Sequence, residues 1–112
     1  MAGEAKITVN GRSYAWPRAP LVVVCVDGSE PDYMDAAVAA GAMPWLASAR
    51  TRGIDQIADC VVPSFTNPNH LSIVTGVPPA VHGIAGNYFY DREADAEVMM
   101  NDPAMLRCGT IL

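Results

Sequence analysis

The sequence predicts an α/β protein in which helices flank a central parallel sheet. Residues 21–26 are continuously apolar, which is typical of a central parallel strand that is covered on both faces. A second apolar stretch, residues 54–62, follows after segments that favour helices. Because this order is strand, helix, strand, we expect a right-handed crossover between two parallel strands.

A small β-hairpin is expected before this unit. Residues 7–9 and 13–16 flank Asn10-Gly11, a pair that is favoured in two-residue turns because both positions need positive φ. Two prolines then end the hairpin. We therefore expect an N-terminal hairpin extension, residues 1–20, followed by an incomplete α/β domain, residues 21–112.

Two helices are predicted between the apolar strands. Pro31 can open a helix at its first turn, and the Ala-rich segment that follows ends at Gly41. A second short helix is expected over residues 44–52, closed by Gly53.

Four further elements are expected in the second half of the chain. A helix of about two turns should begin at Pro68 and end at Gly76, because Pro78 and Pro79 cannot continue it. Residues 88–90 are aromatic and predict a strand. Residues 91–102 are polar and predict a surface excursion, and residues 103–107 predict the start of another helix.

Composition excludes several classes of protein. The net charge is −5 and only seven Lys and Arg are present, which argues against a nucleic-acid partner. The longest apolar run is far too short to cross a bilayer, and the N-terminus has no signal peptide. Three cysteines without a C-x-x-C pair fit a reducing cytosol. We expect a soluble, cytoplasmic protein with no membrane partner.

The size of the chain suggests part of a larger domain. Its 112 residues are 51% hydrophobic, enough for a core, yet two or three central strands leave too few partners to cover both faces of a sheet. We therefore expect the chain to be the N-terminal part of a longer protein.

Thr66 is the first candidate functional residue. It lies in a Pro/Asn-rich turn directly before a helix-compatible run, where backbone N–H groups and the helix dipole favour an anionic ligand. A threonine hydroxyl is a weak nucleophile, and coordination to a metal would activate it. The alternative is that Thr66 only caps the helix.

Asp27 and Asn87 are the other candidates. Asp27 ends the first predicted strand, where open α/β sheets bind their ligands, and a carboxylate there is a hard ligand for a divalent metal. Asn87 could donate its amide to a phosphoryl oxygen. Both are also ordinary turn residues, which remains the alternative. His70 and His82 lack a second ligand at metal spacing, so we expect structural hydrogen bonds for both.

Three motifs together resemble the N-terminal portion of the alkaline phosphatase superfamily. They are V-V-V-C-V-D-G, V-P-S-F-T-N-P-N-H-L-S-I-V-T-G-V-P-P-A-V-H-G-I and G-N-Y-F-Y-D, and their order makes the likeness specific. Within the superfamily they are most similar to the phosphonoacetate hydrolases, relatives of the nucleotide pyrophosphatases/phosphodiesterases. The resemblance implies a partial alkaline-phosphatase-like sandwich for residues 21–112.

The resemblance also implies an activity and a cofactor. By it, Asp27 and Thr66 bind one of two zinc ions, Thr66 attacks phosphorus, and Asn87, 21 positions later, holds a non-bridging oxygen. The reaction would cleave the C–P bond of phosphonoacetate to acetate and phosphate through a phosphothreonine. The family's other ligands come from later in the chain, so we expect these 112 residues to be inactive alone. A homodimer is an expectation for the full-length enzyme only.

Two alternatives stay open. The parent protein could be a phosphodiesterase or nucleotide pyrophosphatase of the same superfamily. The chain could also be a non-catalytic truncated product that buries its sheet edge against a partner.

Overall fold

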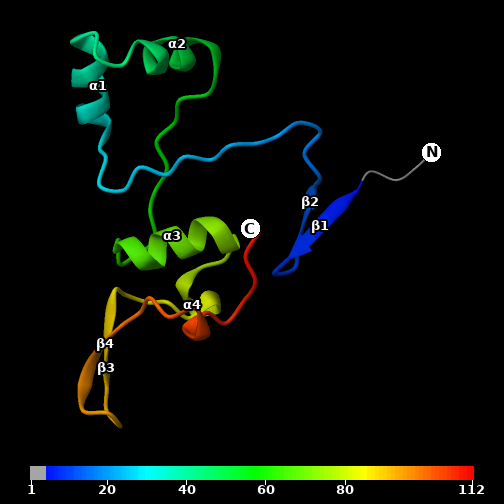
Figure 1. Cartoon of the computed structure of the whole chain (residues 1–112), viewed down its shortest axis with the longest axis vertical. Coiled ribbons are helices and arrows are strands. Elements are labelled where there is room, and N and C mark those ends of the chain that lie inside the picture. Colours follow the sequence, from blue (N-terminus) through cyan, green and yellow to red (C-terminus); the bar gives the residue numbers. More distant parts are fainter. Residues whose placement is uncertain (1–4) are drawn as a thin grey trace. The chain divides into compact units, whose positions relative to one another are not determined.

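The computed structural model describes residues 5–112, so the first four residues of the predicted extension (1–20) lie outside the described residues (Figure 1). The chain divides into two compact units: Met1–Leu21 with Cys60–Leu112, and Val22–Asp59. The elements are β1 (Lys6–Val9), β2 (Arg12–Ala15), α1 (Pro31–Ala39), α2 (Pro44–Arg52), α3 (Thr66–Thr75), α4 (Pro79–His82), β3 (Tyr88–Asp91), β4 (Ala96–Met99) and the 3₁₀ helix η1 (Pro103–Met105). The α/β class is confirmed. Between residues 5 and 112, no helix has both the length and the apolar character needed to cross a membrane.

The predicted N-terminal hairpin is confirmed. Strands β1 and β2 pair antiparallel, with Val9 opposite Arg12. Asn10 and Gly11 form the turn with φ values of 50° and 76°, the positive φ that the Asn-Gly pair predicts.

The side chain of Asn10 joins this hairpin to the rest of its unit. Its Nδ2 donates to the carbonyl oxygens of Thr75 at 2.9 Å and Gly109 at 2.8 Å, and its Oδ1 accepts from the Gly109 N–H at 3.1 Å. Thr75 is the last residue of α3. Asn10 therefore both forms the turn and caps a carbonyl at the end of this helix, where carbonyls lack partners within the helix.

We expect Asn10→Gly to lower the free energy of unfolding by about 1–3 kcal/mol, because the turn tolerates glycine while the side-chain hydrogen bonds are lost. Urea unfolding of the purified chain measures this. Thr8→Ala is the matched control, since it removes only the exposed hydrogen bond to Ser13. Equal unfolding free energies for the two variants would contradict the joining role of Asn10.

The second unit contains both predicted helices between the apolar segments. Helix α1 begins at Pro31, and the chain leaves it through Gly41, whose φ is 72°. Helix α2 begins at Pro44 and is followed by Gly53. Proline at the first turn and glycine after the last turn thus confirm both helices.

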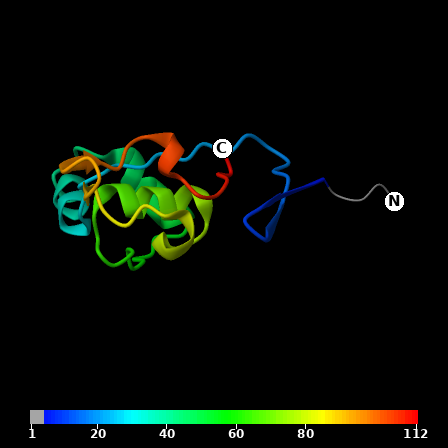
Figure 2. The same ribbon diagram turned by 90° about the horizontal axis from the view of Figure 1, so that it is seen from below.

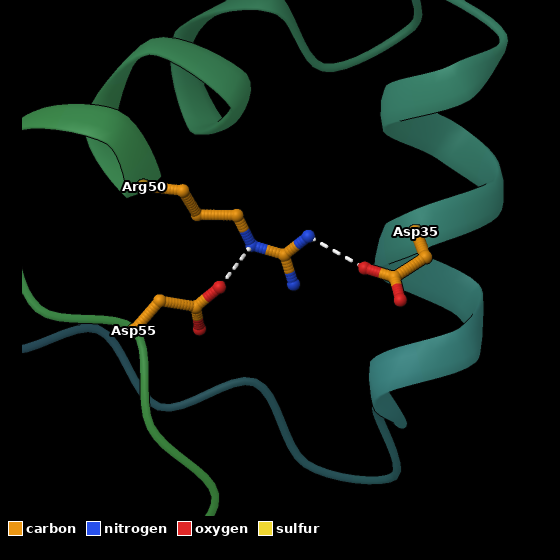
Figure 3. A network of polar contacts seen from close by, with 3 residues as sticks. All are labelled: Asp35, Arg50 and Asp55. Atoms are coloured by element: carbon orange, nitrogen blue, oxygen red, sulfur yellow. Dashed lines mark hydrogen bonds and ion pairs between the residues drawn. The ribbon is translucent and has the colours of Figure 1, made fainter.

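An ion-pair network links α1, α2 and the segment after them (Figure 3). The Arg50 guanidinium donates from Nη1 to Asp35 at 2.6 Å, and its Nε lies 3.0 Å from an oxygen of Asp55. The hydrogen bond with Asp35 raises the pKa of Arg50. Because the pairs face solvent, they fix the arrangement of these side chains more than they stabilise the fold.

The predicted parallel sheet is not formed. Residues 21–26 and 54–62 contain no strand, and both sheets between residues 5 and 112 are antiparallel pairs, β1–β2 and β3–β4. Leu21, Val22 and Ile54 are 77%, 82% and 87% exposed. An apolar run indicates that its side chains favour burial. A β-strand, however, forms only where a neighbouring strand supplies backbone hydrogen bonds. The described residues provide no such neighbour to either segment.

In the last third of the chain one expectation is confirmed and two are met in part: residues 91–102 are mostly exposed, and a short helix starts at Pro103. The aromatic strand β3 forms, but its partner is β4, within the stretch expected to be a surface excursion. The helix expected over residues 103–107 is only the short η1, which Asp102 caps by accepting from the Ala104 N–H at 2.8 Å.

The best-packed part of the described chain is the pair α3 and α4. These helices lie side by side in both views (Figures 1 and 2) and contact each other. The described residues that are fully or nearly fully buried all belong to this region: Pro68, Thr75, His82 and Ile84. This small core supports the segment that carries Thr66.

Candidate functional site

Thr66 is the first residue of α3 rather than its cap. The cap position is occupied by Phe65, which has extended backbone angles, and no side chain caps the helix there. We expected the helix to begin at Pro68, but it begins two residues earlier, at Thr66. The alternative that Thr66 serves only as a cap is therefore wrong. Its half-buried side chain lies at the positive end of a ten-residue helix.

Asn87 is brought to the same turn by a hydrogen bond. The Asn67 backbone N–H, next to Thr66, donates to Asn87 Oδ1 at 3.0 Å. The Asn67 side chain donates from Nδ2 to the carbonyl of Met100 at 2.9 Å, and the Met100 N–H donates to the carbonyl of Asn87 at 2.7 Å. Two of the three predicted site residues, Thr66 and Asn87, are therefore close together.

This network fixes the orientation of the Asn87 amide. A backbone N–H can only donate, so the amide oxygen must face Asn67. The NH₂ group is then the donor end of the side chain. A side chain held in this way can donate to a negatively charged oxygen without first reorganising.

An open concavity of about 530 Å³ adjoins this position. Gly86 and Tyr88, the neighbours of Asn87 in the chain, line it together with Phe89 and Arg107. Because it combines an aromatic wall with a cation, it can accept a small anion that also has an apolar part.

His82, the last residue of α4, is completely buried. Burial lowers the pKa of this imidazole, while a hydrogen bond with the backbone of Pro68 raises it in part. The expected structural hydrogen bonds of His82 are confirmed by its contacts with Ser72 and Ile84.

The lowered pKa of His82 predicts a pH dependence of stability. The unfolded imidazole, near its ordinary pKa of 6.5, takes up a proton before the folded one does. The free energy of unfolding should therefore fall as the pH drops below about 6.5 and be insensitive to His82 above it. Urea unfolding between about pH 7.5 and pH 5.5 measures this. His82→Asn should have the shallower pH dependence, and an identical slope in both proteins would contradict the prediction.

Asp27 lies in the second unit. It occupies a turn with Gly28, whose φ is 67°, and the Ser29 hydroxyl donates to the Val26 carbonyl across this turn at 2.9 Å. The turn chemistry of Asp27-Gly28 is thus present. Its role as a metal ligand stays a prediction.

The described residues do not make a complete zinc site. Over residues 5–112, no three His, Cys, Asp or Glu side chains gather as a metal site requires. Asp27 carries a carboxylate and Thr66 a hydroxyl, and each is an oxygen donor of a type that zinc can accept, but zinc sites usually have three or four protein ligands. Zinc binding by these two residues stays a prediction.

Sequence reasoning missed the residues that hold the site together. Asn67 and Met100 join the Thr66 turn to the Asn87 loop, and only Asn67 lay within a recognised motif. The signal for Met100 would have been the second strand of the β3–β4 hairpin. That strand carries Met100 back to the site.

Comparison with known proteins identifies the family. A family model described as type I phosphodiesterase / nucleotide pyrophosphatase matches residues 21–107. The chain belongs to this family, which lies in the alkaline phosphatase superfamily. An ectonucleotide pyrophosphatase/phosphodiesterase of Caenorhabditis elegans is 34% identical over 85 residues, which are 68% of this chain and 9% of the relative. An uncharacterised pyrophosphatase/phosphodiesterase of Schizosaccharomyces pombe is 36% identical over 77 residues, 66% of this chain and 15% of the relative.

Solved structures give a more specific likeness. The phosphonoacetate hydrolase of Sinorhizobium meliloti 1021, solved in complex with phosphonoformate, matches 97% of this chain with a TM-score of 0.89 and 58% identity. The same enzyme in complex with phosphonoacetate matches with 57% identity. This chain covers 26% of that enzyme, and it spans a still smaller share of the curated relatives named above.

Proposed function

We propose that this chain is the nucleophile-bearing segment of a phosphonoacetate hydrolase. The observation that carries the proposal is the 58% identity with such an enzyme over 97% of the chain. The local structure supports it, because Thr66 begins a helix and Asn87 is hydrogen-bonded to the adjacent residue. The substrate would be phosphonoacetate, and the products acetate and phosphate.

The proposed reaction has two steps. Thr66 Oγ1 forms a bond to phosphorus while the P–C bond breaks, and the electron pair remains on the methylene carbon, which takes a proton to give acetate. Water then attacks the phosphothreonine, releasing phosphate and restoring the hydroxyl. The Asn87 amide would donate to a non-bridging oxygen, and the N-terminus of α3 would favour the negative charge there.

Zinc is part of the proposal as a cofactor. When bound, it would lower the pKa of the Thr66 hydroxyl and neutralise negative charge on the phosphonate. Asp27 and Thr66 would be the ligands from this segment. The other ligands would come from the part of the enzyme that this chain does not cover, so the 112 residues alone should not hydrolyse phosphonoacetate.

A phosphodiesterase or nucleotide pyrophosphatase is the second candidate. The family model and the Caenorhabditis elegans relative favour it. The identity is lower than with the phosphonoacetate hydrolase, and the matched share of the chain is smaller. We therefore rank it second.

A chimera tests the proposal. In it, this chain replaces the matching quarter of the Sinorhizobium meliloti enzyme, and phosphate release from phosphonoacetate is compared with cleavage of a nitrophenyl phosphodiester. We expect kcat/KM for phosphonoacetate within about tenfold of the natural enzyme and no comparable gain of diesterase activity. A folded, zinc-loaded chimera that cleaves only the diester would overturn the assignment.

A further inference from the structure

We propose that His82 is a positioning residue: its buried imidazole joins the Thr66-bearing helix α3 to the loop that carries Asn87. This inference rests on the proposed function for its catalytic consequence. The hydrogen bonds that carry it are independent of that function.

The two ring nitrogens of His82 contact different parts of the site. Nε2 lies 2.9 Å from the hydroxyl of Ser72, in the middle of α3. Nδ1 accepts from the Ile84 N–H at 3.1 Å, at the start of the loop to Asn87. One side chain from α4 thus contacts both the helix and the loop.

These contacts define the protonation of the ring. Ile84 N–H can only donate, so Nδ1 carries no proton and the neutral imidazole has its proton on Nε2. That proton faces α3, where Ser72 and the backbone of Pro68 are the acceptors. Pro68 belongs to the first turn of α3, two residues after Thr66.

The surroundings hold His82 in place. The ring has no exposed surface, and both Pro68 and Ile84 are buried. The His82 carbonyl accepts from the Arg107 N–H at 3.1 Å. Gly83, with a φ of 86°, lies so close to Arg107 that a Cβ would come within 2.8 Å of that side chain. The ring therefore has little room to adopt another orientation.

A closed loop of contacts follows from this arrangement. It runs along α3, through α4 and along residues 83–87, and the bond between Asn67 and Asn87 closes it beside Thr66. Inside this loop, the hydrogen bonds of the His82 ring join α3 to the segment that leads to Asn87. Without these hydrogen bonds, the distance between Thr66 and Asn87 would no longer be fixed, and small displacements at a reacting centre slow the chemical step strongly.

The test uses His82→Asn and His82→Gln in the chimera, with Val81→Ala as the control on the exposed side of the same helix. At a temperature where circular dichroism shows each variant folded, we expect kcat to fall by about 10- to 100-fold while KM changes by less than about threefold. Val81→Ala should match the parent. A kcat within about twofold of the parent in both His82 variants would overturn the proposal.

A second variant covers the case in which neither His82 variant folds. Ser72→Ala removes one acceptor of the ring and should lower kcat by about three- to tenfold, without effect on KM. An unchanged kcat in Ser72→Ala would contradict the positioning role of His82. Nitrogen-detected NMR of the 112-residue chain gives a readout free of activity: we expect a neutral ring with its proton on Nε2, and a proton on Nδ1 would contradict the proposal.

Failure of this inference is distinguishable from failure of the proposed function. Loss of phosphonoacetate hydrolysis on removing the Thr66 hydroxyl, together with unchanged kcat in the His82 variants, rejects only the role of His82. Activity that survives removal of that hydroxyl rejects the function itself.

Discussion

Thr66→Val in the chimera should lower kcat for phosphonoacetate by at least about 10⁴-fold, the scale of losses when an enzyme's nucleophile is removed. Valine has nearly the shape of threonine and carries a methyl group in place of the hydroxyl. Thr66 is the first residue of α3, and the cap position before it belongs to Phe65. Phosphate release under steady-state conditions measures the effect.

Thr66→Ser is the matched control for this loss. Serine keeps a hydroxyl on the same carbon, so a measurable part of the activity should remain. A Thr66→Val chimera that retains more than about a tenth of the parent kcat would show that another group attacks phosphorus.

Asn87→Asp should lower kcat by about 10²- to 10³-fold, the range for losing a donor that stabilises developing negative charge. An aspartate oxygen can still accept from the Asn67 N–H, so the loop stays attached. The NH₂ donor is replaced by an acceptor that repels the phosphonate.

Asn87→Ala separates these two functions of the side chain. It removes both the donor and the contact with Asn67, so it should also lower the free energy of unfolding, by about 1–3 kcal/mol. Urea unfolding and kcat on the same variants measure both effects. An Asn87→Asp chimera as active as its parent would mean that the amide does not contact the phosphonate.

The parts of the fold that the sequence predicted are those specified by neighbouring residues. Asn10-Gly11 defines the hairpin turn, and proline before and glycine after define α1 and α2. Each signal acts through backbone geometry within a few residues. No distant partner is needed for it to operate.

The parts that sequence reasoning could not predict depend on residues distant in the chain. Residues 21–26 favour burial, yet the pattern does not say which strand pairs with them, and between residues 5 and 112 none does. Strand β4 was missed for the opposite reason. Its mostly exposed side chains lack the alternation of a half-buried strand, while its backbone pairs with β3.

In the candidate site, too, local features could be predicted from the sequence and long-range contacts could not. Thr66 and Asn87 became candidates through their residue types and the resemblance to a known family, and that resemblance alone assigned their roles. Their connection through Asn67 could not be predicted, because it depends on the path by which the β3–β4 hairpin and α4 return the chain to α3. The role of His82 in that path required knowing which hydrogen bonds its two ring nitrogens make.

The most direct test of the central claim is whether a phosphoryl group from phosphonoacetate is found on Thr66. The chimera would be mixed with phosphonoacetate, quenched in acid within its turnover time, digested and analysed by mass spectrometry. We expect the added mass of one phosphoryl group on the peptide that contains Thr66, absent in Thr66→Val. Phosphate release with no phosphorylated peptide at any quench time, or phosphorylation of a different residue, would contradict the account.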